Sequence, residues 1–251
     1  MNAPALAPSC HGRRGRIGAP AATDPLMSEA LLPAIEVETA ENADAAVIWM
    51  HGLGDDGRGW SEVVPMLGLP AAARIRFLFP HAPVMPVTIN NGMRMRAWYD
   101  IRQANLTERA DLEGVRHSQS LVNALQEREI ARGIAPSRMV LAGFSQGGAI
   151  ALYSGIRYGA RLAGIVGLST YLVAADRVVE EASAANRDVP IFMAHGTHDP
   201  VIQYAWAGHS RDVLVAGGWP VEWHSYPMEH SAVPEELAAV GRFLAGVLAP
   251  R

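Results

Sequence analysis

The segment Gly143–Gly147 reads Gly-Phe-Ser-Gln-Gly, so that Ser145 has a glycine two positions away on each side. This G-x-S-x-G pattern is typical of a sharp strand-to-helix turn, which holds a serine hydroxyl above a sheet where it can attack a carbonyl carbon. An apolar run, Met139–Gly143, precedes the motif, and a run of mostly small and apolar residues, Gly147–Tyr158, follows it. Since both neighbours fit such a turn, we interpret Ser145 as a nucleophile. The alternative is an ordinary glycine-rich turn.

A serine nucleophile needs hydrogen-bond donors for the oxyanion that forms when it attacks a carbonyl group. The backbone N–H of the residue after the nucleophile, Gln146, is one expected donor. The second is expected from a loop after an earlier strand, and the apolar run Ala45–Met50 is followed by the glycine-rich segment His51–Gly57. Within that loop we assign the second donor to the backbone N–H of Leu53. Without Ser145, an ordinary glycine-rich loop would be the better interpretation.

The nucleophile also needs a base and an acid, which follow it in the chain order Ser, Asp or Glu, His. Asp199 comes just after the apolar run Pro190–Ala194, and His230 comes just after the run Val221–Tyr226. Both therefore lie where a strand has ended, which is the position from which a side chain can reach the site. We predict Asp199 as the orienting acid and His230 as the general base. His224 lies inside its run and is the alternative base.

A metal site is a second interpretation of the segment around Asp199. His195 and His198 are three residues apart and lie close to this aspartate, and such groups can ligate zinc. The segment is a strand end and a turn, however, and not a helix that would align the two imidazoles on one face. We therefore expect no metal and no cofactor.

The elements that must position these residues alternate along the chain. Strands are predicted at Ala34–Thr39, Ala45–Met50, Ile75–Phe79, Met139–Gly143, Ala163–Leu168, Pro190–Ala194 and Val221–Tyr226. Helices are predicted at Asp111–Arg132, Gly147–Tyr158, Gln203–Ala216 and Pro234–Leu248. This alternation predicts an α/β fold, a mainly parallel sheet with helices on both faces and the site at the C-terminal ends of its strands. The run Val221–Tyr226 alternates in polarity and is expected near an edge.

The composition indicates one large globular domain and excludes several classes of partner. The chain has 251 residues, of which 49% are hydrophobic and 18% charged, so it is not a disordered chain. Its net charge is −4 and it contains no long basic run, which argues against a nucleic-acid or anionic-membrane partner. No apolar run reaches the ~18 residues that stable membrane insertion requires. The single cysteine, Cys10, cannot form an internal disulfide, and we expect a cytoplasmic protein.

Residues 1–30 differ from the rest of the chain. They are rich in alanine, proline, glycine and arginine, and hold a small basic cluster of Arg13, Arg14 and Arg16. No apolar core of signal-peptide length follows these arginines. We predict a flexible N-terminal extension over residues 1–30 and a catalytic domain over residues 31–251.

Six motifs, in order, carry a resemblance to a known family. They are His51-Gly52-Leu53-Gly54-Asp55, Phe79-Pro80-His81-Ala82-Pro83, Trp98-Tyr99-Asp100, Gly143-Phe144-Ser145-Gln146-Gly147-Gly148, His195-Gly196-Thr197-His198-Asp199-Pro200-Val201 and His230-Ser231. From about Leu31 to Leu248 the chain resembles the bacterial carboxylesterases that are grouped with acyl-protein thioesterases and lysophospholipases. The resemblance implies a compact α/β-hydrolase fold without a large lid domain. It assigns the same residues: a triad of Ser145, Asp199 and His230, and the amides of Leu53 and Gln146.

The resemblance also implies an acyl groove and an activity. Relatives line their groove with the region Val87–Asp100 and with the loop after Leu168. Trp98, Tyr171 and Leu172 are therefore candidate groove residues, and packing in the core is their alternative. The implied activity is a serine carboxylesterase that hydrolyses short-to-medium acyl esters, small molecules, through an acyl-enzyme. An acyl-protein thioesterase or lysophospholipase would use the same triad, and a non-catalytic binding protein on this fold is a third hypothesis. Since relatives include dimers, a homodimer is a possible assembly.

Overall fold

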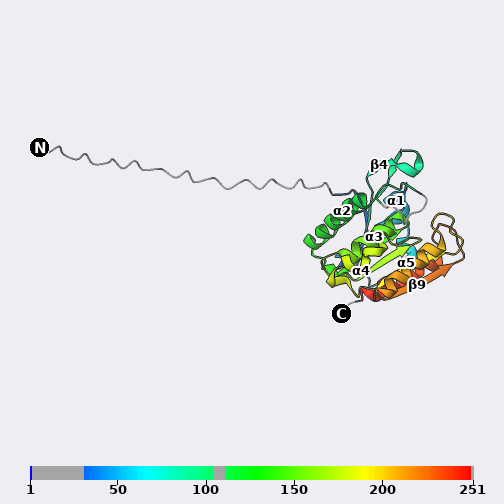
Figure 1. Ribbon diagram of the computed structural model, residues 1–251. Coiled ribbons are helices and arrows are strands. Elements are labelled where there is room, and N and C mark those ends of the chain that lie inside the picture. The colour runs from blue at the N-terminus through cyan, green and yellow to red at the C-terminus, as the bar shows by residue number, and fades with distance from the viewer. Residues whose placement is uncertain (2–30, 104–110, 250–251) are drawn as a thin grey trace. The chain divides into compact units, whose positions relative to one another are not determined.

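A sheet of seven strands forms the centre of the structure (Figure 1), a computed structural model that describes residues 1, 31–103 and 111–249. The strands are β1 (Ala34–Glu38), β2 (Ala45–Met50), β3 (Ile75–Pro80), β6 (Met139–Phe144), β7 (Gly164–Leu168), β8 (Ile191–Gly196) and β9 (Val221–Tyr226). Their spatial order is β1-β3-β2-β6-β7-β8-β9, and only β1 runs antiparallel to its neighbour. The predicted extension, residues 1–30, lies outside the described residues apart from Met1.

The predicted strands are all present, and each observed boundary lies within two residues of its predicted position. Strands β2, β6 and β7 are buried along almost their whole length, as expected for parallel strands that are covered on both faces. Strand β9 alternates between exposed and half-buried residues and lies at the edge of the sheet, as predicted. The predicted fold class is thus confirmed, and the described part of the chain holds no separate lid domain.

Helices cover both faces of the sheet. The four long ones are α2 (Leu112–Ala131), α3 (Gln146–Arg157), α5 (Tyr204–Ala216) and α6 (Pro234–Val247), and the two short ones are α1 (Gly57–Ser61) and α4 (Val178–Glu181). Alternate residues of each strand point to opposite faces, so the core has two halves. Helices α2, α3, α4 and α5 pack into one half and α1 and α6 into the other. Among the described helices, none is both long and apolar enough to cross a bilayer.

An additional hairpin, which the sequence analysis missed, stands apart from the main sheet. Strands β4 (Val84–Val87) and β5 (Met93–Arg96) pair only with each other. Val87 is their only fully buried residue, and β5 alternates methionine with arginine, so the pattern of apolar residues does not reveal them. The adjacent Asn91 and Gly92, both with positive φ in the connecting turn, are a hairpin signal that could have done so. Short 3-10 helices at Val64–Leu67, Thr88–Asn90, Pro136–Arg138, Ala175–Arg177 and Ala184–Asn186 were also not predicted.

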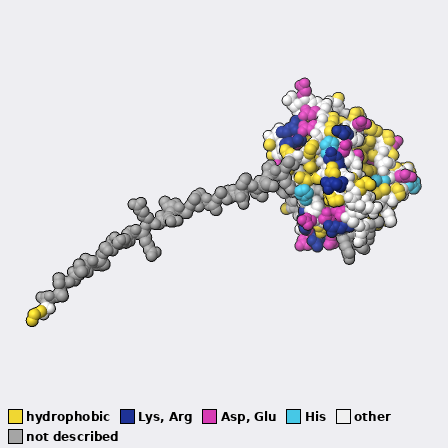
Figure 2. Space-filling model, turned by 90° about the horizontal axis from the view of Figure 1, so that it is seen from above, with side chains coloured by type: hydrophobic (Ala, Val, Ile, Leu, Met, Phe, Trp, Pro, Cys, Tyr) yellow, Lys and Arg dark blue, Asp and Glu magenta, His cyan; other side chains and the backbone are white. Residues whose placement is uncertain are grey.

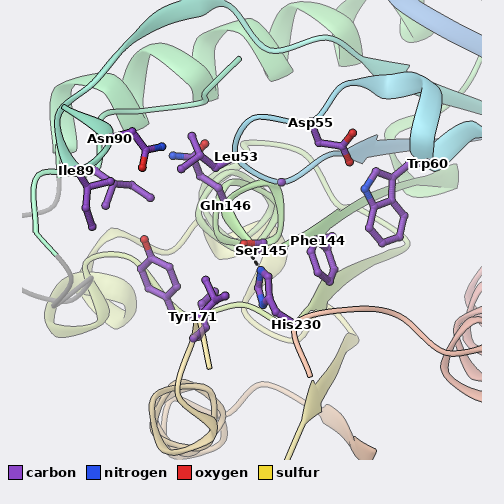
Figure 3. A pocket seen from close by; sticks show the side chains of 14 residues that line it. Leu53, Asp55, Trp60, Ile89, Asn90, Phe144, Ser145, Gln146, Tyr171 and His230 are labelled. Atoms are coloured by element: carbon purple, nitrogen blue, oxygen red, sulfur yellow. Dashed lines mark hydrogen bonds between the residues drawn. The ribbon is translucent and has the colours of Figure 1, made fainter. Parts of the chain in front are cut away.

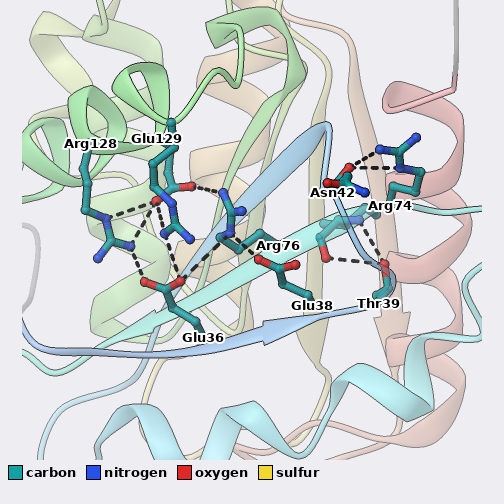
Figure 4. A network of polar contacts seen from close by, with 10 residues as sticks. Glu36, Glu38, Thr39, Asn42, Arg74, Arg76, Arg128 and Glu129 are labelled. Atoms are coloured by element: carbon teal, nitrogen blue, oxygen red, sulfur yellow. Dashed lines mark hydrogen bonds and ion pairs between the residues drawn. The ribbon is translucent and has the colours of Figure 1, made fainter.

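Charged side chains of both signs lie beside one another on the face drawn in Figure 2. A network of charged side chains links β1, β3 and α2 (Figure 4). The carboxylate of Glu129 is fully buried and lies 2.7 Å from Arg76, 3.0 Å from Arg128 and 3.1 Å from Arg132. Glu36 bridges Arg128 and Arg132 from β1, at 2.8 and 2.9 Å. Burial would raise the pKa of Glu36, but the hydrogen bond and charges of these arginines outweigh it and hold the pKa below its ordinary value.

Replacing Glu129 with alanine is expected to lower the free energy of unfolding by about 3–5 kcal/mol, because it leaves the buried Arg76 guanidinium without its buried anion. Urea denaturation followed by far-UV circular dichroism measures the change. The control is Asp212→Ala, which removes an exposed ion pair with Arg211 (2.7 Å) and is expected to cost less than about 1 kcal/mol. Equal losses for the two variants would contradict this role of Glu129.

Candidate active site

Ser145 occupies a strained turn between β6 and α3. Its backbone has φ 54° and ψ −121°, and residues other than glycine rarely adopt such a positive φ. Two hydrogen bonds hold this conformation: the Ser145 N–H donates to the carbonyl of Leu168 at 2.8 Å, and the Thr170 hydroxyl donates to the Ser145 carbonyl at 2.7 Å. The turn therefore matches the strand-turn-helix context that the G-x-S-x-G motif requires.

Close packing explains why positions 143 and 147 of the motif are glycines. A Cβ atom on Gly147 would lie only 2.3 Å from the carbonyl oxygen of Met50 and 2.5 Å from that of His51. A Cβ atom on Gly143 would lie 2.4 Å from the carbonyl carbon of Gly147. The first turn of α3 thus passes against both β6 and the end of β2, and only glycine allows this approach.

Ser145, His230 and Asp199 form one chain of hydrogen bonds. The Nε2 atom of His230 lies 2.9 Å from the Ser145 hydroxyl oxygen, and its Nδ1–H donates to Oδ2 of Asp199 at 2.7 Å. The three residues follow β6, β9 and β8 at the C-terminal ends of these strands. Figure 3 shows His230 directed at Ser145 across the pocket floor. The structure therefore brings together the three residues that the chain order selected.

The Asp199 carboxylate is buried and receives a full set of donors. Its Oδ1 atom accepts the backbone N–H groups of Val201 and Ile202 at 2.8 and 2.9 Å. Its Oδ2 atom lies 3.3 Å from Nε2 of His195, which donates to the Ile202 carbonyl at 2.8 Å. Burial holds the pKa of His195 below its ordinary value, so that this imidazole is neutral at pH 7. These contacts hold the carboxylate in place for His230.

The two predicted oxyanion donors both border the pocket beside Ser145. Gln146 is the first residue of α3, where a backbone N–H has no acceptor within its own helix. Its side chain accepts from the Trp98 N–H at 2.9 Å and donates to the Tyr99 carbonyl at 2.8 Å. The Trp98 indole N–H in turn donates to the His51 carbonyl at 2.9 Å, two residues before Leu53. The two donor segments are thus linked to each other through Trp98.

The cavity at Ser145 has a volume of about 420 Å³, within the range of small-molecule sites. The lining residues are Gly52, Leu53, Asp55, Trp60, Ile89, Asn90, Ile101, Phe144, Ser145, Gln146, Tyr171, Val201, Ile202 and His230. Tyr171, a predicted groove residue, lines the cavity, and its hydroxyl lies 2.6 Å from that of Tyr99. Burial raises the pKa of Tyr171 to about 12, so that the hydroxyl is protonated at neutral pH.

The other two predicted groove residues do not line this cavity. Trp98 is 2% exposed and lies behind the wall, because its indole N–H is committed to the backbone of the loop after β2. Leu172 is 3% exposed and packs into the core, and the Ser210 hydroxyl accepts its backbone N–H. Both side chains pack in the hydrophobic core of the described structure.

Several lining residues escaped the sequence analysis. Phe144 and Val201 are sequence neighbours of Ser145 and Asp199, and this adjacency could have identified them. Trp60 follows the His51–Gly57 loop by three residues and Ile101 directly follows the Trp98-Tyr99-Asp100 motif, so sequence proximity could have identified these two as well. Ile89 lies in the region Val87–Asp100 that the resemblance assigned to the groove.

The alternatives for His224 and His195 are resolved by their surroundings. His224 stacks on Phe192, with ring centroids 5.0 Å apart, and its Nε2 lies 2.8 Å from Glu222. It thus packs against β8 and does not join the hydrogen-bonded chain at Ser145. Across residues 31–103 and 111–249, no three His, Cys, Asp or Glu side chains are grouped to hold a metal ion.

Comparisons with known proteins give one consistent result. Residues 33–248 match the phospholipase/carboxylesterase family. The chain is 39% identical over 234 residues to acyl-protein thioesterase 1 of Gibberella zeae, covering 90% of this chain and all of that protein. It is 40% identical over 228 residues to acyl-protein thioesterase 1 of Neurospora crassa, covering 87% of this chain and 93% of that protein.

Solved structures agree. A Zea mays acyl-protein thioesterase 2 superposes with a TM-score of 0.75 at 32% identity, over 86% of this chain and 99% of that one. Arabidopsis thaliana SOBER1 superposes with a TM-score of 0.76 at 29% identity, over 81% of this chain and 99% of that one. The placement in the bacterial branch stays a prediction. The family match covers most of this chain, and the acyl-protein thioesterase relatives align along nearly their whole length. The chain is therefore a hydrolase that belongs to the phospholipase/carboxylesterase family.

Proposed function

We propose that the protein is a serine hydrolase that cleaves carboxylic esters of short-to-medium acyl chains through an acyl-enzyme. The observation that carries the proposal is the hydrogen-bonded chain of Ser145, His230 and Asp199 at the floor of a cavity. A hydroxyl in this arrangement is activated because the imidazole can accept its proton as the C–O bond forms.

Each residue has a role in two successive half-reactions. His230 removes the Ser145 proton as the oxygen attacks the carbonyl carbon, and Asp199 holds the imidazole through the Nδ1–H bond and stabilises its positive charge. The N–H groups of Leu53 and Gln146 stabilise the oxyanion, and each such donor contributes about 10²–10³-fold to kcat. His230 then protonates the departing alcohol or thiol, which leaves an acyl group on Ser145. Water, activated by His230, releases the acid and regenerates the hydroxyl.

The runner-up, an acyl-protein thioesterase or lysophospholipase, uses the same residues. It is favoured by the names of the full-length fungal relatives at 39–40% identity. The apolar wall of Ile89, Ile101 and Tyr171 suits an acyl chain in both cases. The two activities differ in the leaving group and in the acyl length that the cavity accepts.

Replacing Ser145 with alanine is expected to lower kcat for an aryl ester by about 10⁴- to 10⁶-fold, because no nucleophile remains. Labelling by a fluorophosphonate probe should disappear with it, while the melting temperature changes little. Ser154→Ala, a buried serine on the same helix, is the control and should retain both activity and labelling. Hydrolysis that survives Ser145→Ala unchanged would refute the proposal.

His230→Ala and Asp199→Asn are both expected to lower kcat by several orders of magnitude with a smaller change in KM, because they remove the base and its orienting acid. His224→Ala is the matched control, since it alters a histidine of β9 that stacks on Phe192 and is not part of the hydrogen-bonded chain at Ser145. A near-normal His230→Ala enzyme would transfer the role of base to His224.

A series of ester and thioester substrates with acyl chains of increasing length separates the two candidate activities. We expect the highest kcat/KM for short-to-medium esters, because the cavity is limited to about 420 Å³. A maximum at long-chain thioesters or lysolipids would instead establish the runner-up. The profile is read as kcat/KM for each acyl length under identical buffer and salt.

A further inference from the structure

The cavity has two sides that differ in chemistry (Figure 3). Ile89, Asn90 and Tyr171 lie on one side of Ser145, and Phe144, Trp60 and Asp55 lie on the other. On the first side the lining side chains carry no charge. On the second side an exposed carboxylate borders a surface of aromatic rings.

The aromatic rings of the second side are continuous with the catalytic imidazole. The ring centroids of His230 and Phe144 are 4.8 Å apart, and those of Phe144 and Trp60 are 5.0 Å apart. Trp60 is held from behind by a stacked contact with the buried Trp49 at 5.5 Å. A row of aromatic rings therefore extends from His230, the group proposed to protonate the departing alcohol or thiol, to Trp60, which lies on the same side of the cavity as Asp55 (Figure 3).

Asp55 is free to interact with a ligand. Its side chain accepts a hydrogen bond from the Asp56 N–H at 2.8 Å, which fixes the carboxylate beside the loop. The neighbouring cation, Arg58, lies 3.6 Å from Asp56 instead, and none of the ion pairs among the described residues involves Asp55. Within residues 31–103 and 111–249, the negative charge at this end of the cavity is therefore not compensated by an ion pair.

We infer that this second side is a subsite for a leaving group that carries a cation, a quaternary ammonium or a protonated amine, with Asp55 as the residue that selects it. The inference rests on the proposed function, since it places the leaving group on the side of His230. Aromatic faces attract a cation through their quadrupole, and a carboxylate within the same subsite adds Coulomb attraction. The uncharged side is then left for the acyl chain, so the charge distribution also orients the substrate.

The test compares two thioesters of equal shape, butyrylthiocholine and S-(3,3-dimethylbutyl) thiobutyrate. Their leaving groups differ only in a quaternary nitrogen in place of a quaternary carbon. In Asp55→Asn, which keeps the oxygen that accepts from Asp56, kcat/KM for the cationic thioester should fall about three- to tenfold relative to its neutral partner. Raising the salt concentration to ~0.5 M should reduce this difference in the wild-type enzyme, because an exposed charge is screened.

The control variant is Asp212→Asn, which makes the same change in net charge on α5 and should leave the ratio of the two kcat/KM values unchanged. An equal loss for both thioesters in Asp55→Asn would overturn the inference, because it would mean that Asp55 only supports the oxyanion loop. An unchanged ratio would overturn it as well.

A binding measurement separates this inference from the proposed function. The affinity of both thioesters for Ser145→Ala and for Ser145→Ala/Asp55→Asn is measured by titration calorimetry, which needs no turnover. A cation preference that depends on Asp55 would support the subsite even if the wild-type enzyme hydrolysed neither thioester, whereas its absence would reject the subsite even if hydrolysis were rapid.

Discussion

The close approach of α3 to the end of β2 is the constraint on which the site depends. It forces glycine at position 147, because any Cβ atom there would meet the carbonyl oxygens of Met50 and His51 at 2.3 and 2.5 Å. Because of this approach, the first N–H of α3 and the loop after β2 both lie beside the Ser145 hydroxyl. The positive φ of Ser145 costs on the order of 1–3 kcal/mol of conformational free energy. The hydrogen bonds that the Ser145 backbone makes with the Leu168 carbonyl and the Thr170 hydroxyl help to offset this cost. The proposed nucleophile and the proposed oxyanion donors thus depend on one packing contact.

The surrounding loops are held to this contact by buried hydrogen bonds. The Gln146 side chain binds the backbone of Trp98 and Tyr99, and Trp98 binds the carbonyl of His51. His51 is itself buried, and its Nε2 accepts the Ala82 N–H at 3.1 Å. Each of these polar groups would cost free energy if it lost its partner, since water cannot reach it. The arrangement keeps the donors in position before a substrate arrives, which is how such sites stabilise developing charge.

Much of this could be predicted because it follows from periodicity and chain order. The seven strands, the edge position of Val221–Tyr226, and the meeting of Ser145, Asp199 and His230 all follow from the rule that parallel strands end at one edge. The β4–β5 hairpin was missed because its side chains are exposed. Trp98 and Leu172 pack in the core, because a motif marks a residue without showing which way its side chain points. Trp60 and Ile101 lie within three residues of motifs that the sequence analysis named, but those motifs do not show that the next side chains face the cavity.

The position of His230 has a consequence for how activity arises. It follows β9, which is both the last strand in the chain and the edge of the sheet, and it must reach a serine 85 residues earlier. During synthesis, the turn at Ser145 can form long before His230 has been made. On the proposed mechanism, hydrolysis therefore requires that β9 has added to β8 and brought His230 to Ser145. Recovery of activity during refolding would then measure completed assembly, because a chain cut short before β9 would lack the proposed base.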